Sequence, residues 1–268
     1  MTEPALLTQE IGGVLQLTLN RPAKYNALNR EIFDGLRAGL EQLIERRDLR
    51  VLLIRANGRY FSAGADLSDA PVPEMSGSSS AVRTWYRRSL NGMLAFYQEL
   101  EATEKPIVVA HHGPCVGGGL ELSMSCDFRL AAASATYAFP EANFGSLPAT
   151  GGVSRLTRLV GAEWARWMIM ANMPVDAARA RSIGLVHEVY ADAEFDLRVM
   201  EFCQHLCKQP PEFMAMAKIA IEFARDLEST QARNAERLAN SVLTLGAEHQ
   251  ELVTAWKARF TKRNPSEN

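Results

Sequence analysis

Three consecutive glycines, Gly117–Gly119, stand between a strand-like run, "KPIVVAHH", and a helix-like run, "LELSMSC". Bare backbone at the start of a helix exposes N–H groups, and the helix dipole adds to their attraction for negative charge. The order of strands, loops and helices along the chain, with such loops after strands, fits an α/β fold that binds its ligand at the ends of strands. The triplet predicts a site for an anion or a developing oxyanion, unless the glycines serve only close packing.

Hydrophobic periodicity repeats the same strand, loop and helix order along the chain. Leu15, Leu17 and Leu19 alternate as in a half-buried strand, and Asn29 is a plausible N-cap for the helix that follows. From Gly151 onward the pattern is mostly helical, apart from residues 185–190. The other predicted strands are residues 50–57, 105–112, 127–134 and 135–139, and a further helix is predicted over 81–102.

Two glutamates and a second glycine turn suggest what the triplet does. Glu121 would repel a phosphate, and "GGGLELS" lacks the G-K-[S/T] ending of a phosphate loop. An oxyanion hole beside a general base fits better. Glu141 in "FPEANFGSLPATGG" offers a second carboxylate, and repulsion in a shared pocket would raise one pKa, giving one acid and one base. Gly64 permits a turn that aims the Ala65 N–H at the same place.

Charge and cysteine usage narrow the class of protein. The net charge of −2 argues against binding nucleic acid, which normally needs a cationic surplus. No basic leader and no run of about 18 apolar residues is visible, so we expect a soluble, cytoplasmic protein without a membrane span. Cys203, His205 and Cys207 are expected on different sides of a helix, so we predict no metal site.

At these residues the sequence resembles the crotonase family, the enoyl-CoA hydratase/isomerase superfamily. Five blocks occur in the family's order and spacing: "LTLNRPAKYNALN", "FSAGADL", "KPIVVAHHGPCVGGGLELSMSCDFRLAAASATYAFPE", "GSLPATGGVSRLTRLVG" and "ARSIGLVHEV". The resemblance implies an α/β fold with a spiral core of ββα units over residues 1–200. It also implies a helical region over 201–268 that forms homotrimers, which commonly pair into hexamers.

The resemblance further implies how a substrate is held. By motif position, the N–H groups of Ala65 and Gly118 resemble the pair that polarises the thioester carbonyl of an acyl-CoA. The segment that lines CoA corresponds to Ala63, Asp66 and Leu67, and Lys24 lies in a loop that runs near the CoA phosphates in relatives. Two weaker matches to residues that reach CoA are Trp256 and Arg259.

The activity implied is that of an enoyl-CoA hydratase, because both positions that are glutamate in hydratases are glutamate here, Glu121 and Glu141. Glu121 would take a proton from water and Glu141 would deliver one to Cα, with no cofactor beyond the CoA of the substrate. The alternatives are an enoyl-CoA isomerase in which Glu141 alone shuttles a proton, another crotonase-family acyl-CoA enzyme such as a hydrolase or decarboxylase, an RNA-binding relative, or an inactive scaffold.

Two departures bear on the acyl group. Where relatives usually carry a glycine after "FGSLP", this chain has Ala149 and Thr150, which would reshape the pocket. The Ser-rich loop at 68–80 and the helix after it also lie where relatives differ by substrate. In that helix, three arginines would suit an acidic acyl tail, although a solvated basic face is the more ordinary interpretation: Arg83, Arg87 and Arg88.

Overall fold

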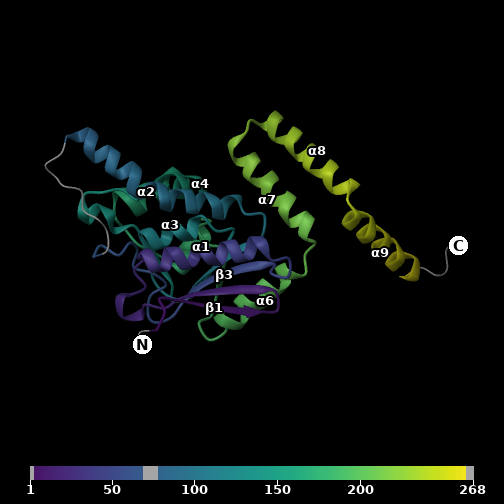
Figure 1. The fold of residues 1–268 in the computed structure, drawn as a ribbon, viewed down its shortest axis with the longest axis horizontal. Coiled ribbons are helices and arrows are strands. Elements are labelled where there is room, and N and C mark those ends of the chain that lie inside the picture. Colours follow the sequence, from purple (N-terminus) through teal and green to yellow (C-terminus); the bar gives the residue numbers. More distant parts are fainter. Residues whose placement is uncertain (1–2, 69–77, 264–268) are drawn as a thin grey trace. The chain divides into compact units, whose positions relative to one another are not determined.

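The computed structural model describes residues 3–68 and 78–263, and these form two compact units, Met1–Cys207 and Lys208–Asn268 (Figure 1). The division expected at residues 200–201 falls inside helix α6 (Phe195–Cys207). This helix packs against strands of the large sheet and buries Phe195, Val199, Cys203 and Leu206. The whole of α6 therefore belongs to the first unit.

A six-stranded sheet forms the centre of the first unit. Its order is β1-β2-β3-β4-β6-β9, with β1 antiparallel to β2 and every other neighbouring pair parallel. The strands are β1 (Leu6–Ile11), β2 (Val14–Leu19), β3 (Val51–Ala56), β4 (Ile107–His111), β6 (Phe128–Ala132) and β9 (Glu188–Tyr190). The sequence pattern did not predict β1, whose residues are mostly exposed.

Strand β2 is buried on both faces, so the prediction of a half-buried strand was wrong. Leu15, Leu17 and Leu19 are fully buried, but Val14 is too, and Thr18 is only 6% exposed. The cause is tertiary, because both α6 and helix α1 (Arg30–Glu45) pack against this strand. Helix α1 does begin as predicted, with the Asn29 side chain accepting a hydrogen bond from the N–H of Ile32.

A second, three-stranded sheet lies beside the course of the chain that the spiral of ββα units implies. Its order is β5-β7-β8, and Ser62 joins it through a single parallel bridge to Cys115. The chain thus makes the same excursion three times: a strand of the large sheet, a short segment at the small sheet, then a helix. The strands of the small sheet are β5 (Cys115–Val116), β7 (Thr136–Ala138) and β8 (Val175–Asp176). The helices that end the three excursions are α2 (Ser79–Ala102), α3 (Gly118–Met124) and α4 (Gly152–Ala165).

Shorter elements complete this unit and carry parts of the candidate site. They are the 3-10 turns η1 (Pro22–Lys24) and η2 (Pro140–Phe144), the π-helical turn η3 (Arg166–Met170) and helix α5 (Ala177–Ser182). The repeated excursions leave the loop after β3, the start of α3 and the turn η2 as connections at the small sheet. These are the segments that the sequence motifs singled out.

The second unit consists of three helices, α7 (Pro211–Asp226), α8 (Ser229–Leu245) and α9 (Ala247–Arg263), drawn from green to yellow in Figure 1. Of its described apolar side chains only Ala232 is buried. Large apolar side chains are exposed along all three helices, including Leu245 at 82%. Within the described part of the chain, no helix combines the length and apolarity needed to cross a membrane.

Candidate active site

The loop after β3 and the start of α3 meet backbone to backbone. Gly64 has a φ of +96°, and a Cβ built on it would lie 3.2 Å from the nitrogen of Gly118. A Cβ on Gly118 would in turn lie 3.3 Å from the nitrogen of Ala65. The two segments therefore approach with no side chain between them, which is the physical reason for glycine at both positions.

Two backbone amides at this contact are available to a ligand. The loop is fixed on either side of Ala65, because Leu28 donates its N–H to Gly64 and accepts one from Asp66. Gly118 is the first residue of α3, where a backbone N–H has no partner within the helix. Within residues 3–68 and 78–263, neither the Ala65 N–H nor the Gly118 N–H has an acceptor. The pair predicted from sequence thus lies together with both donors free.

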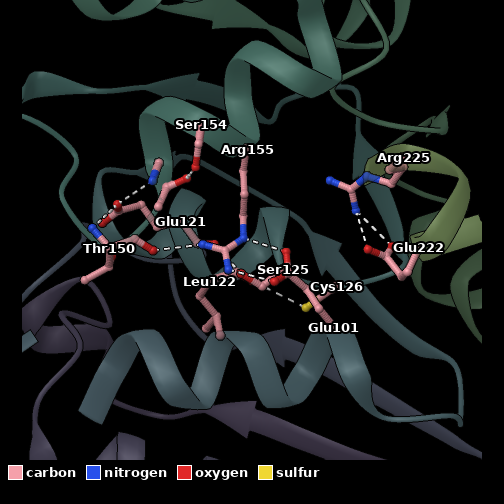
Figure 2. A network of polar contacts seen from close by, with 12 residues as sticks. Glu101, Glu121, Leu122, Ser125, Cys126, Thr150, Ser154, Arg155, Glu222 and Arg225 are labelled. Carbon is pink, nitrogen blue, oxygen red and sulfur yellow. Dashed lines mark hydrogen bonds and ion pairs between the residues drawn. The ribbon is translucent and has the colours of Figure 1, made fainter. Parts of the chain in front are cut away.

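Glu121 lies in the first turn of α3 and is held by a distant turn. Its Oε1 accepts hydrogen bonds from the N–H groups of Thr150, at 2.8 Å, and Gly152, at 3.0 Å (Figure 2). The side chain is buried, with the residue 5% exposed. Burial raises the pKa of Glu121 above its ordinary 4.5, while hydrogen bonds from this turn and the charge of Arg155 oppose the rise.

Glu141 reaches the same glycine turn from η2. A Cβ on Gly117 would lie 2.8 Å from the Glu141 Oε1, so the carboxyl rests against bare backbone. Its Oε2 is buried and has no hydrogen-bond partner among the described residues. Burial, with a further contribution from the charge of Glu121, raises the pKa of Glu141 from 4.5 to about 7. Both carboxyl pKa values rise, and burial rather than mutual repulsion is the main cause.

Sequence reasoning missed the ion pair that supports this arrangement. Arg155 of α4 donates to both oxygens of Glu101, at the end of α2, and to the carbonyl of Thr150 (Figure 2). The only sequence signal for Arg155 is its place just after the Gly151–Gly152 pair. Nothing local marks Glu101 among the charged residues of its helix.

The residues expected to line CoA have different surroundings. Ala63 is half-buried and donates its N–H to the carbonyl of Tyr25, which brings the loop beside η1 and its exposed Lys24. Leu67 is 66% exposed. Asp66 instead accepts a hydrogen bond from the Ser68 hydroxyl and forms an ion pair with Arg21 at 2.8 Å, and these two contacts lower its pKa to about 2. Asp66 therefore fastens the loop whose neighbouring residues are the CoA candidates.

The remaining sequence candidates lie on other elements of the chain. Trp256 and Arg259 are exposed on α9 of the second unit. On α2, Arg83, Arg87 and Arg88 are exposed, and residues 69–77 of the Ser-rich loop lie outside the described residues.

The two residues that depart from the family pattern, Ala149 and Thr150, differ in their exposure to solvent. Ala149 is exposed, whereas Thr150 is 3% exposed. The Thr150 hydroxyl has no partner in hydrogen-bonding geometry among the described residues. Since the same residue donates its N–H to Glu121, the extra hydroxyl changes the polarity beside that carboxylate.

The cysteine-rich segment has a structural role. His205 is exposed, but Cys203 and Cys207 lie one turn apart on the same side of α6, so the expectation that all three diverge was wrong. Burial raises the pKa of the Cys203 thiol to about 12, so it stays protonated. In the described ranges, no group of three or more histidine, cysteine, aspartate or glutamate side chains could hold a metal ion.

Comparisons with known proteins place this geometry in a family. The sequence model described as Enoyl-CoA hydratase/isomerase matches residues 9–263. The Enoyl-CoA isomerase/hydratase fer4 of Mycosarcoma maydis is 31% identical over 265 residues, covering 96% of this chain and 93% of the relative. The 2,3-dehydroadipyl-CoA hydratase of Escherichia coli K12 is 29% identical over 252 residues, covering 94% of each.

Solved structures confirm the predicted α/β crotonase fold. An enoyl-CoA hydratase crystal structure from Geobacillus kaustophilus superposes with a TM-score of 0.85 at 29% identity, and covers 95% of both chains. The DspI structure from Pseudomonas aeruginosa gives a TM-score of 0.84 at 31% identity, over 95% of this chain and 94% of that one. The chain therefore belongs to the enoyl-CoA hydratase/isomerase family.

Proposed function

We propose that the protein is an enoyl-CoA hydratase, which adds water across the 2,3 double bond of a 2-enoyl-CoA thioester to give a 3-hydroxyacyl-CoA. One observation carries the proposal: the buried carboxyl of Glu121 and the partly buried carboxyl of Glu141 flank the glycine turn, which presents the free amides of Ala65 and Gly118. Hydration needs a base for water, an acid for Cα and donors for the thioester oxygen, and this turn offers all three.

In the proposed hydration, one proton passes from water to Glu121 and another passes from Glu141 to Cα. Glu121, as carboxylate, takes a proton from water while the water oxygen bonds to Cβ. The electron pair of the double bond moves through Cα to the thioester oxygen, whose charge is stabilised by the N–H groups of Ala65 and Gly118. Glu141, as carboxylic acid, gives its proton to Cα and the thioester carbonyl re-forms. These steps move only protons and electron pairs, so the proposal requires no metal or redox cofactor.

The environments of the two glutamates support this division of roles. Two N–H donors on one oxygen of Glu121 favour its ionised form. Glu141 has a pKa of about 7 and no donor on Oε2 among the described residues, so near neutral pH a substantial fraction carries a proton. A raised pKa near the working pH is what a general acid needs.

Substrate binding and self-assembly extend the proposal. We assign the CoA moiety to the loop at 62–68 and to Lys24, since η1 and that loop are joined by the bond from Ala63 to Tyr25. We also propose a homotrimer or a dimer of trimers. Its support is apolar surface that a lone chain leaves in water, including Phe213, Ile221, Phe223, Leu238, Val242 and Leu245.

Isomerisation between 3-enoyl- and 2-enoyl-CoA is the second candidate function, and the unpartnered Oε2 of Glu141 favours it, because one free carboxyl can move a proton between two carbons. The matching family description and the relative from M. maydis both include isomerases. In that case Glu121 would serve structure alone.

A substrate panel in heavy-oxygen water separates the candidates. Purified protein is mixed in turn with 3-enoyl-CoAs and with straight, branched, aromatic and acidic 2-enoyl-CoAs. The enoyl-thioester absorbance is followed, and the product masses are measured by mass spectrometry. We expect rapid loss of absorbance and gain of one labelled water on at least one member. Isomerisation of 3-enoyl-CoAs without retained solvent oxygen would overturn the hydratase proposal. With CoA binding established, no reaction at all would indicate hydrolytic or decarboxylating chemistry instead.

A further inference from the structure

We propose that Arg155, clamped by Glu101, is a positioning residue that fixes the turn at residues 150–152, so that the two N–H groups of this turn orient the Glu121 carboxylate. This inference deepens the proposed function and rests on it for the role of Glu121 as base. It concerns residues that touch neither the proposed substrate nor the reacting atoms.

Contacts on both sides of the turn carry the proposal. The Nε and Nη2 of Arg155 bond to the two oxygens of Glu101, at 2.6 and 2.8 Å. The remaining nitrogen, Nη1, donates to the carbonyl of Thr150 at 2.9 Å. All three guanidinium nitrogens are therefore engaged, and one guanidinium spans the end of α2 and the turn before α4 (Figure 2).

The guanidinium of Arg155 occupies space that is open only because residue 151 is glycine. Gly151 has a φ of +94°, and a Cβ built on it would lie 2.0 Å from the Arg155 Nη1. The guanidinium therefore packs directly over the glycine backbone. The residues before and after this glycine, Thr150 and Gly152, are those whose N–H groups meet the Oε1 of Glu121. A shift of the guanidinium would move the two donors together.

Energetics favour a positioning role over simple stabilisation. The Arg155 side chain is 8% exposed and that of Glu101 is 24% exposed. The cost of removing two charges from water offsets much of their attraction, so a buried pair is a poor way to gain stability. Its fixed fork geometry is what an apolar pair of the same volume could not supply.

Charge acts in the same direction as geometry. Glu121 is faced by Tyr97 of α2, by Glu141 of η2 and by Arg155 of α4. Of these three, only Arg155 contributes a positive charge, and it lowers the pKa of Glu121 against the larger effect of burial. Loss of Arg155 should therefore loosen the carboxylate and also leave it protonated to a higher pH.

The test replaces both partners of an ion pair at once, so that neither is left as an unpaired charge. The double variant Arg155→Met/Glu101→Gln removes the clamp, and Arg155→Lys keeps the charge but not the fork. The matched control is Arg181→Met/Glu188→Gln, which removes a second two-bond arginine–glutamate pair that lies on the surface. For each variant we measure kcat and KM against pH, and the titration of the Glu121 side-chain carboxyl by carbon-13 NMR, assigned by difference from Glu121→Gln.

We expect the clamp variant to lose about 10- to 100-fold in kcat, as a small misplacement of a catalytic group does, with KM nearly unchanged. In this variant, the acid limb of the kcat profile and the midpoint of the Glu121 titration should both move to higher pH. Arg155→Lys should restore the position of the limb more than the rate, and the surface control should match the wild type.

Two outcomes would overturn the proposal. One is a clamp variant whose Glu121 titration and pH profile equal those of the wild type, which would leave the pair a purely structural role. The other is an equal effect of the surface control. If the clamp variant does not fold, Arg155→Lys tests the fork geometry alone, and a kcat equal to that of the wild type would then overturn the proposal. If the wild type hydrates nothing, the proposed function fails, but the NMR titration still tests the positioning.

Discussion

Glu121 and Glu141 carry the same carboxyl group in contrasting surroundings. Glu121 lies on a helix, is 5% exposed, and has one oxygen bonded to two N–H groups of the turn at 150–152. Glu141 lies on a short 3-10 turn, and residues 142–147, which follow it in the chain, are exposed. One of its oxygens is buried without a partner among the described residues.

The difference shows how one site can hold an acid and a base of the same residue type. Burial raises both pKa values, so it cannot by itself assign the roles. What separates the two is the set of donors: the N–H groups and Arg155 favour a charged Glu121, while Glu141 has no positive neighbour among the causes of its shift. The comparison therefore predicts Glu121 as base and Glu141 as acid.

The largest expected effect comes from removing either carboxyl. Glu121→Gln and Glu141→Gln should each reduce turnover at least about 100-fold, the range for general acid–base groups, while acyl-CoA binding measured by calorimetry stays nearly intact. Exchange of the Cα protons of a saturated acyl-CoA with deuterated water sharpens the contrast, because only Glu141 acts at Cα. Glu121→Gln should retain this exchange and Glu141→Gln should lose it. Full turnover in either variant would remove that residue from the mechanism.

An effect of intermediate size is expected in the pH profile of hydration. Since Glu141 must be protonated and has a pKa of about 7, kcat should fall about tenfold for each pH unit well above 7. Since Glu121 must be ionised and its pKa is raised above 4.5, the acid limb should lie above pH 4.5. The two limbs belong to the coupled pair. Residual activity of Glu141→Gln measured from pH 5 to 9 should lack the alkaline limb, and an unchanged limb would contradict the acid role.

The smallest expected effect is on stability. The folded protein holds a proton on Glu141 up to a pKa of about 7, whereas the unfolded chain releases it near 4.5. The free energy of unfolding should therefore fall as pH rises between these values and level off above them. Glu141→Gln lacks this loss, so its melting temperature should gain on the wild type between pH 5 and 8, as calorimetry would show.

A control of opposite sign strengthens that measurement. The hydrogen bond from Arg181 lowers the pKa of Glu188, so the wild type gains a little stability from this pair as pH rises through the ordinary range of a carboxyl. The melting temperature of Glu188→Gln should therefore fall slightly relative to that of the wild type over this range. Parallel behaviour of the two variants would show that the effect at Glu141 does not come from its burial.

Much of the fold and of the site follows from local pattern. The N-cap at Asn29 and the glycines that let the two amides approach are legible because each depends on residues close in sequence. Glu121 stands out beside the glycine triplet for the same reason, whereas Glu141 stands out in a loop of its own between Pro140 and the Gly151–Gly152 pair. The double burial of β2 could not be predicted from its alternation, because it depends on helices that pack from distant parts of the chain.

By itself, the sequence determined most of the strand and helix order, the glycine turn and the presence of two carboxyls. The tertiary structure alone decided what distinguishes those carboxyls. Glu101 and Arg155 are separated by 54 positions, and Thr150 and Glu121 by 29. Their partnership exists only once α2, α3 and α4 have packed around one turn. A pKa reports burial and charges within a few ångströms, and those distances are set by folding rather than by neighbours along the chain.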